Sequence, residues 1–329
     1  MKSINYIISL LIIAVLVFIG NMYVNQPNDF VLFTALSDTN SLDYLILWKI
    51  RIPRFILALL AGGGLSLAGY LMQHLTNNSL ADPYLLGTAG GASLGANLVI
   101  TGLVPLGIFS IGGITIGAFL VALLVTVLLM VIAHENGKIN VFKLLLGGVA
   151  LTSLTGSLNT LILFMVSDKN QLSEIIFWSM GALSRATWTS ISILSVVLFS
   201  TLILLVFLKK ELSLILLGEE KASLLGMKVE QFKWGIVILS TLITAVTVSF
   251  TGPIGFIGLF IPHFIRHVFG VNGAFNSIFV VLTGGVFLAT CDGLSKVIYP
   301  PVGLPIGIIT AILGIPFFIF LVIKSNYKF

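Results

Sequence analysis

The sequence predicts an all-α integral membrane protein with about ten transmembrane helices. Of its 329 residues, 57% are apolar and only 9% are charged, and its mean hydropathy is +1.13. Charged residues make up about a quarter of a soluble domain, so this composition excludes a soluble globule. Apolar runs recur along the chain, and many of them approach the length of about 20 residues that an α-helix needs to cross a bilayer.

Ten apolar segments are candidate spans, and together they form a single transmembrane domain over residues 1–329. The candidates are residues 4–24, 54–74, 85–104, 108–133, 144–166, 189–208, 234–250, 255–270, 276–297 and 306–324. The first follows Lys2, as in a signal peptide, but no small-x-small cleavage pattern comes after it, so we expect a retained helix. We find no soluble domain and no internal repeat of the kind that many secondary carriers have.

Basic residues predict the orientation of these spans, because Lys and Arg gather on the cytoplasmic side of membrane proteins. With the N-terminus inside, most of the 17 Lys and Arg residues fall on that side. The outer side then holds Lys49, Arg51, Arg54, Lys169, Arg185 and Lys296. We therefore expect a multi-pass protein of the cell (inner or cytoplasmic) membrane, in contact with lipid, whose N- and C-termini are both cytoplasmic.

Three connecting segments have unusual sequences. Residues 77–83, NNSLADP, form a short polar inner loop. Residues 167–188 form an outer segment whose apolar patch, 175–180, suits a short helix at the membrane interface. Residues 209–233 form the longest inner loop, and acids followed by a glycine-bounded stretch predict a short helix over 221–225. This helix is either an ordinary amphipathic connector or a docking helix for a cytoplasmic partner.

The segment TGPIGFIGLFIPHFIRH, residues 251–267, predicts a helix that breaks and restarts, because glycines and prolines interrupt an apolar run. Irregular backbone in a membrane is tolerated only where protein or a water-filled cavity covers it. The segment therefore lines a pathway or forms a tightly packed kink. His263 and His267 share one helical face, but no carboxylate or cysteine lies nearby in the sequence, so we expect no metal site.

No catalytic constellation is present. The chain has no HExxH, GxSxG or Walker lysine motif, and its single cysteine, Cys291, excludes an internal disulfide. The net charge of +5 reflects the inner rim of a membrane protein and not a nucleic-acid partner. Asp292 and Lys296 are spaced for a simple ion pair, and no chain of acids crosses the bilayer midplane to couple transport to protons or sodium. We therefore expect neither an enzyme nor a bound cofactor.

Five stretches together resemble the FecCD-type permeases, which are the membrane subunits of ATP-binding-cassette (type II) importers for iron–siderophores, haem and cobalamin. The stretches are RIPRFILALLAGGGLSLAGYLMQHLTNNSLADPYLLGTAGGASLG, LLLGGVALTSL, LGEEKASLLGM, GPIGFIGLFIPHFIRH and GLPIGIITAILGIPFFIFL. The resemblance implies ten transmembrane helices per subunit and a pair of permease subunits, expected to be a homodimer. It also implies two cytoplasmic ATPase subunits that bind ATP and Mg²⁺, and an extracytoplasmic substrate-binding protein.

The resemblance also implies roles for two inner regions. The ATPase coupling surface matches Leu217, Gly218, Glu219, Glu220, Leu225 and Gly226, within the loop 209–233. This match favours a docking helix over a plain connector. The inner gate matches Asn78, Ser79 and Leu80, with a second segment near Val141 and Phe142. Many relatives carry Asn-Pro-Leu in the first segment, so Ser79 predicts a less rigid loop.

On the outer side, the resemblance implies that Arg51, Arg54 and Lys296 are sockets for glutamates of the binding protein. An arginine holds a carboxylate with two hydrogen bonds, and complementary charge speeds docking. A lysine keeps the charge but loses the two-pronged contact. Arg185 stands near the outer mouth, where it either faces an anionic cargo or is an ordinary surface cation, and we favour the surface cation.

The leading hypothesis is therefore the permease subunit of an ATP-driven importer for an iron–siderophore, haem or cobalamin. One alternative is a membrane scaffold or sensor that partners an ATPase without transporting. A second alternative is an ion-coupled secondary carrier, which the lack of midplane acids makes the weakest of the three.

Overall fold

The computed structural model describes residues 2–24, 41–105, 112–271, 275–300 and 303–324. Within these ranges, seven helical segments are long and apolar enough to cross a membrane. The segments are α1 (Lys2–Tyr23), the run of α3 (Leu42–Ile46), η1 (Leu47–Arg51) and α4 (Ile52–Leu75), α6 (Gly113–Ala133), α7 (Val141–Met165), α9 (Trp188–Phe207), α12 (Val229–Thr251) and α14 (Asn276–Ile298). The all-α membrane fold is confirmed.

Shorter elements complete the described part of the chain. They are η2 (Pro83–Leu86), α5 (Thr88–Ile100), α8 (Lys169–Ser179), α10 (Lys209–Ile215), α11 (Glu219–Leu224), α13 (Ile257–Phe269), α15 (Ile306–Lys324) and the strands β1 (His134–Glu135) and β2 (Lys138–Ile139). Each of the ten predicted spans overlaps one helix, and α5, α13 and the apolar part of α15 are the short ones. The outer segment 167–188 and the inner loop 209–233 contain the helices expected there, α8 and α11.

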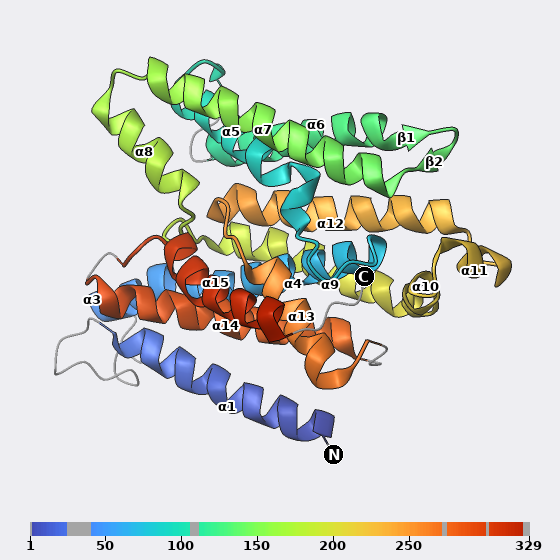
Figure 1. The fold of residues 1–329 in the computed structure, drawn as a ribbon. Coiled ribbons are helices and arrows are strands. Elements are labelled where there is room, and N and C mark those ends of the chain that lie inside the picture. The colour runs from blue at the N-terminus through green and yellow to red at the C-terminus, as the bar shows by residue number, and fades with distance from the viewer. Residues whose placement is uncertain (1, 25–40, 106–111, 272–274, 301–302, 325–329) are drawn as a thin grey trace.

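Helix α4 lies at the centre of the molecule, between α14, α12, α13 and α9 (Figure 1). Small residues allow these helices to approach closely. A Cβ atom at Gly62 of α4 would collide with the carbonyl oxygen of Gly284 in α14. Likewise, a Cβ atom at Gly69 would collide with the backbone of Gly258 in α13. The glycines of the resemblance motifs therefore set the spacing of the core.

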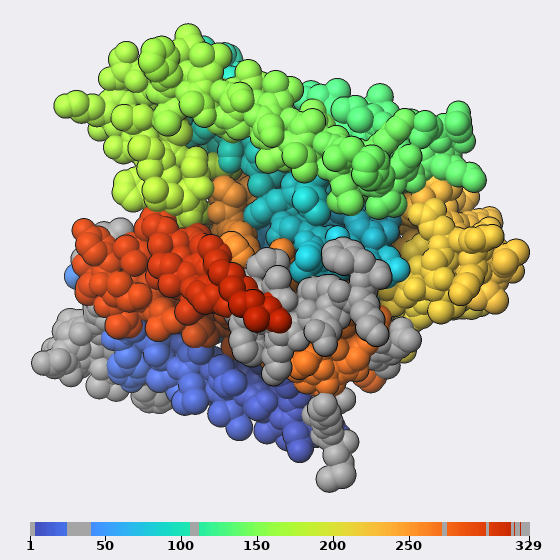
Figure 2. Space-filling model, in the orientation of Figure 1, coloured from blue at the N-terminus to red at the C-terminus, as the bar shows by residue number. Residues whose placement is uncertain are grey.

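The connecting elements gather at two opposite ends of the helices. Figure 1 shows α3 and α8 at one end, and α10, α11 and the β1–β2 hairpin at the other, where α1 begins. In the space-filling view of Figure 2, the surfaces of the hairpin and of α10–α11 adjoin along one edge of the molecule. We refer to these two ends as outer and inner, following the orientation expected from the basic residues.

The predicted helix break lies between α12, which ends at Thr251, and α13, which begins at Ile257. Gly252 and Phe256 have left-handed backbones, with φ of 68° and 73°, and this conformation is uncommon for a residue other than glycine. Protein covers the break, because the Tyr84 hydroxyl of η2 donates to Ile254 O at 3.0 Å and accepts from Ile254 N at 2.9 Å. Pro262, which we expected to contribute to the break, lies inside α13 instead.

Candidate functional site

Asp292 is the centre of a buried charge cluster at the outer end of the spans. Its carboxylate pairs with Arg54 Nη2 at 2.7 Å and with Lys296 Nζ at 2.7 Å. The Asp292 side chain is only 1% exposed, and those of Arg54 and Lys296 are 15% and 11% exposed. The expected Asp292–Lys296 ion pair is therefore present, and Arg54 of α4 is an additional partner that sequence spacing could not reveal.

Arg51 occupies the end of α1 next to this cluster. Its Nη1 donates to the carbonyl oxygens of Asn21, Met22 and Val24 at 3.2, 2.7 and 2.9 Å. The carbonyls of the last helical turn lack partners within the helix and attract a cation. Lys296 reaches the same helix, because its Nζ donates to Asn21 Oδ1 at 3.0 Å. The three predicted socket residues thus lie together, and each has partners within the chain.

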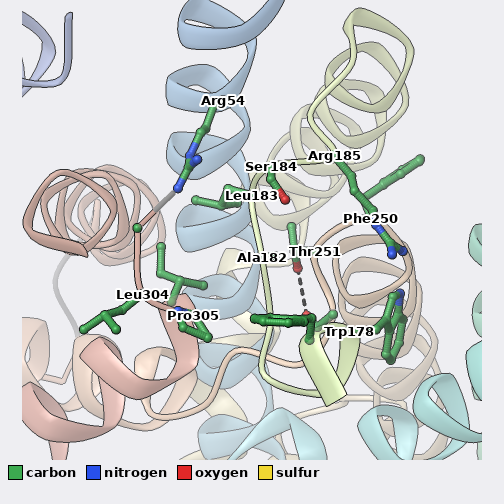
Figure 3. A pocket seen from close by; sticks show the side chains of 15 residues that line it. Arg54, Trp178, Ala182, Leu183, Ser184, Arg185, Phe250, Thr251, Leu304 and Pro305 are labelled. Carbon is green, nitrogen blue, oxygen red and sulfur yellow. Dashed lines mark hydrogen bonds between the residues drawn. The ribbon is translucent and has the colours of Figure 1, made fainter. Parts of the chain in front are cut away.

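An outer cavity of about 300 Å³ lies beside this cluster. Its lining includes Arg54, Trp178, Arg185 and Phe250, and Figure 3 shows the two arginines on opposite sides of it. Arg185 Nη2 pairs with Glu174 Oε1 of α8 at 2.9 Å, and both side chains are more than 40% exposed (44% and 43%). The charge of Arg185 at the mouth is therefore largely balanced by its neighbour.

The loop predicted as the inner gate follows α4 directly. Asn78 Oδ1 accepts the Leu80 N–H at 2.9 Å, and the Ala81 N–H donates to Asn78 O at 3.2 Å. These bonds form an Asx turn, in which the asparagine side chain takes the place of backbone bonding. The loop is therefore a hydrogen-bonded turn even though Ser79 replaces the proline of many relatives. Asn78, whose side chain orders the turn, is a residue that the loop shares with the Asn-Pro-Leu pattern.

Asp82 ends the same loop and begins η2. Its Oδ1 accepts the Tyr84 N–H at 2.8 Å, which fixes the first turn of η2. Burial raises the pKa of Asp82 to about 6, although the Tyr84 hydrogen bond acts in the opposite direction. This acid was not singled out from the sequence, and only its position before Pro83 hints at a helix cap.

The second predicted gate segment, Val141 and Phe142, forms the first turn of α7. Asn140 caps that turn, because its Oδ1 accepts the N–H groups of Phe142 and Lys143 at 3.0 and 3.2 Å. The Phe142 side chain is 69% exposed at the inner end. The β1–β2 hairpin, which the sequence did not predict, directly precedes this segment, and its strands pair His134 with Ile139 and Glu135 with Lys138.

The predicted coupling residues include the first two residues of α11, Glu219 and Glu220, and the residues that flank the helix. Gly218 before the helix and Gly226 after it have left-handed backbones, with φ of 96° and 84°. The Gly226 N–H donates to Ser223 O at 2.9 Å and the Met227 N–H to Ala222 O at 3.1 Å, which is the Schellman end expected of a glycine stop. Leu217 and Leu225, which flank the helix, are 53% and 58% exposed.

Lys233 is a second inner residue that the sequence analysis did not single out. Lys233 of α12 is 1% exposed, and its Nζ pairs with Glu219 Oε2 at 2.8 Å and Glu230 Oε1 at 2.9 Å. The i,i+3 spacing of Glu230 and Lys233 could have suggested the second pair. Nothing in the sequence links Lys233 to Glu219. Within the described ranges, no group of three or more His, Cys, Asp or Glu side chains is arranged to hold a metal ion.

A sequence profile of the FecCD transport family matches residues 7–324. This chain belongs to the FecCD transport family. The hemin transport system permease protein HmuU of Yersinia pestis is 34% identical to it over 290 residues, covering 88% of this chain and 86% of HmuU. The vitamin B12 import system permease protein BtuC of Vibrio cholerae is 31% identical over 287 residues, covering 87% of this chain and 85% of BtuC.

A solved structure has the same fold. It is described as an inward-facing conformation of an ABC transporter of the metal-chelate type, and it matches with a TM-score of 0.85 and 26% identity over 97% of this chain and 98% of its own. The FecCD chain is thus a multi-pass permease of an ABC importer and not a catalytic enzyme. A permease of this kind works with an ATPase and a binding protein.

Proposed function

We propose that this FecCD permease carries haem, an iron–siderophore or cobalamin into the cell. An extracytoplasmic binding protein delivers the cargo to a pair of identical permease subunits, and two cytoplasmic ATPase subunits hold ATP and Mg²⁺ and drive transport. The cargo class follows from the family and from the relatives named above. In this proposal both termini lie in the cytoplasm and the permease itself binds no cofactor.

The surface of α11 is the observation that carries this proposal. Leu217, Leu224 and Leu225 are 53%, 83% and 58% exposed, at the end of the molecule that we assign to the cytoplasm. Glu220 is exposed beside them. Leucines grouped on a glycine-bounded helix in a loop suit a protein partner, because an apolar patch with a polar rim is typical of interaction sites. We assign the partner as the ATPase, with the predicted coupling residues as the contact.

At the outer end, Arg54 is the best-placed contact for an acidic residue of the binding protein. It lines the outer cavity and is the most exposed member of the Asp292 cluster. Arg51 and Lys296 are engaged with the end of α1, so a docking carboxylate has to bind beside them or displace those contacts. We propose that they add positive potential, which speeds docking, while Arg54 makes the direct contact.

The inner gate in this proposal consists of the turn at Asn78–Leu80 and the first turn of α7 at Val141–Phe142. Both are supported by side-chain caps, from Asn78 and from Asn140. Two such turns brought together from paired subunits could close a path on the inner side. Their movement apart would open it when the ATPase subunits change state.

The test is transport into vesicles by the assembled complex. The permease is reconstituted with the ATPase and binding protein encoded beside its gene, and haem, cobalamin and a ferric siderophore are offered in turn. We expect ATP-dependent accumulation of one cargo and faster ATP hydrolysis when its loaded binding protein is added. ATP turnover without accumulation of any cargo would instead indicate a scaffold or sensor. Uptake that needs no ATP and stops with an ionophore would indicate a secondary carrier.

The variant Arg54→Gln tests the outer contact within the same assay. It removes one cation while Lys296 continues to pair with Asp292. We expect weaker binding of the loaded binding protein and an unchanged amount of ATPase bound to the permease. Unchanged affinity for the binding protein would rule out Arg54 as the direct contact.

A further inference from the structure

Lys233 is a fully buried cation at the inner end of α12. Its ammonium group has three contacts: Glu219 Oε2 at 2.8 Å, Glu230 Oε1 at 2.9 Å and the carbonyl oxygen of Ile139 at 2.8 Å. A lysine has three N–H donors, so these contacts use all of them. A buried charge is stable only when it is paired and hydrogen-bonded in this way. The three partners come from three different elements, α11, α12 and β2.

The same cluster holds strand β2 by its backbone. Lys233 donates to Ile139 O at 2.8 Å, and the second carboxylate oxygen of Glu230 accepts the Ile139 N–H at 2.7 Å. Both polar backbone groups of Ile139 are thus bonded to side chains of α12. The Ile139 side chain is also buried, at 2% exposure. The position of β2 is therefore fixed relative to α12 and, through Lys233, relative to Glu219.

The next residue connects this cluster to the gate segment. Asn140 follows Ile139 directly and caps the first turn of α7 through the N–H groups of Phe142 and Lys143. Its Nδ2 also donates to Glu135 at 3.2 Å, and Glu135 pairs with Lys143 at 2.8 Å. The hairpin and the start of α7 are therefore held as one unit. A continuous series of bonds runs from the first residue of α11 to Val141 and Phe142.

We propose that Lys233 is a positioning residue that transmits the movement of α11 to the inner gate at Val141–Phe142. This inference rests on the proposed function, in which α11 is the surface that the ATPase moves. Within α11, only Ala222 is buried, so packing alone holds the helix weakly to the rest of the chain. The bond between Glu219 and Lys233 is the contact through which a shift of α11 pulls on this cluster. The bonds from Lys233 and Glu230 to Ile139 then pass the shift to the hairpin.

The test compares Lys233→Met, Glu219→Gln and the double variant in the reconstituted complex. Lys233→Met replaces the side chain with an unbranched one that is a single atom shorter and uncharged. Lys210→Met is the matched control, because Lys210 is an exposed lysine of α10 outside the cluster. We measure the amount of ATPase bound, the rate of ATP hydrolysis and the amount of cargo imported per ATP hydrolysed.

We expect the Lys233→Met complex to assemble and hydrolyse ATP, with the amount of cargo imported per ATP reduced about tenfold, a typical size for coupling between two sites. Lys210→Met should import as much cargo per ATP as the wild type. Lys233→Arg, which keeps the positive charge, should import more cargo per ATP than Lys233→Met. Because the two residues act through one bond, the double variant should lose no more than Lys233→Met alone. A normal ratio in Lys233→Met, or additive losses in the double variant, would overturn the inference. A wild-type complex that imports nothing would instead reject the proposed function.

A distance measurement covers the case in which Lys233→Met fails to fold. Spin labels are placed on cysteines at Ser223 of α11 and Lys138 of β2, both exposed, in a chain whose one native cysteine, Cys291, is buried. In the otherwise wild-type complex we expect the same label distance with and without ATP, because Lys233 makes the two elements move together. In the Glu219→Gln chain the distance should differ between the two states. A distance that changes equally in both chains would contradict the inference.

Discussion

The two ends of this permease bury charge in opposite ways. At the outer end, one acid, Asp292, is held between two cations, Arg54 and Lys296. At the inner end, one cation, Lys233, is held between two acids, Glu219 and Glu230. The outer cluster joins residues of spanning helices, whereas the inner cluster joins a spanning helix to a short helix and a hairpin. Similar chemistry thus fixes helices in place at one end and connects surface elements at the other.

The sign of the excess charge also differs between the two buried clusters. The outer cluster leaves excess positive charge near a cavity mouth, and the inner cluster leaves excess negative charge near an exposed apolar helix. Complementary charge on a partner speeds its encounter and selects it against others. The comparison therefore predicts an acidic partner outside and a partner with basic groups inside. Loss of Asp292, the counter-charge that both cations share, should mainly lower stability.

The largest effect is expected from Asp292→Asn. This change leaves Arg54 and Lys296 in a buried site without their shared counter-charge, and breaking such a group costs about 3–5 kcal/mol. We expect a large fall in the thermal unfolding midpoint of the detergent-purified permease. Glu174→Gln, which breaks an exposed pair, is the control and should change the midpoint little. Equal midpoints for the two variants would show that the outer cluster does not stabilise the fold.

An intermediate effect is expected from the pH dependence of Asp82. Burial raises its pKa to about 6 in the folded chain, so the folded state holds this proton more tightly than the unfolded chain. The resulting stability is fully present below about pH 4 and is lost as the pH rises through about 6. Asp82 is half-buried and not fully enclosed. After allowance for screening by solvent, the fall in the free energy of unfolding is about 1–2 kcal/mol.

Asp82→Asn tests this dependence, because an amide oxygen can still accept the Tyr84 N–H but cannot titrate. We expect the unfolding midpoint of the wild-type chain to fall by more than that of Asp82→Asn between about pH 4 and 7. If the unfolding midpoints of the two proteins changed equally with pH, Asp82 would not titrate in this range.

The smallest effect is expected from Arg185→Gln. Its pair with Glu174 is exposed on both sides, and such pairs contribute less than about 1 kcal/mol. Because Glu174 already balances the charge of Arg185, transport in the vesicle assay should remain within about twofold of wild type. A selective loss of anionic cargo would show that Arg185 faces the cargo at the mouth.

Much of the fold could be predicted from the sequence, because hydropathy alone locates helices in a membrane. Each of the ten expected spans overlaps a helix, and the glycine pattern located the break before Ile257. The prediction that Pro262 contributes to the break was wrong, because Pro262 lies inside α13. A proline is tolerated within a membrane helix when neighbouring groups satisfy the backbone carbonyl that loses its hydrogen bond. The β1–β2 hairpin was missed because two-residue strands leave almost no pattern in a sequence.

The candidate sites could be predicted only in part. Local spacing suggested the Asp292–Lys296 pair, which is one helical turn apart. The contacts of Arg54 with Asp292 and of Lys233 with Glu219 depend on how distant segments pack, so one sequence does not reveal them. The same limit applies to Arg51, whose bonds to the end of α1 give it a structural role beyond the docking role implied by family resemblance. Its docking role stays a prediction.

The most direct test of the account is the binding of the ATPase to the variant Leu224→Glu. Leu224 is 83% exposed on α11, so a charge there should leave the unfolding midpoint of the permease unchanged. If α11 is the surface through which the ATPase acts, the purified Leu224→Glu permease should retain little or no ATPase, whereas Lys210→Met should retain the wild-type amount. Wild-type affinity of the ATPase for a normally folded Leu224→Glu permease would contradict the account.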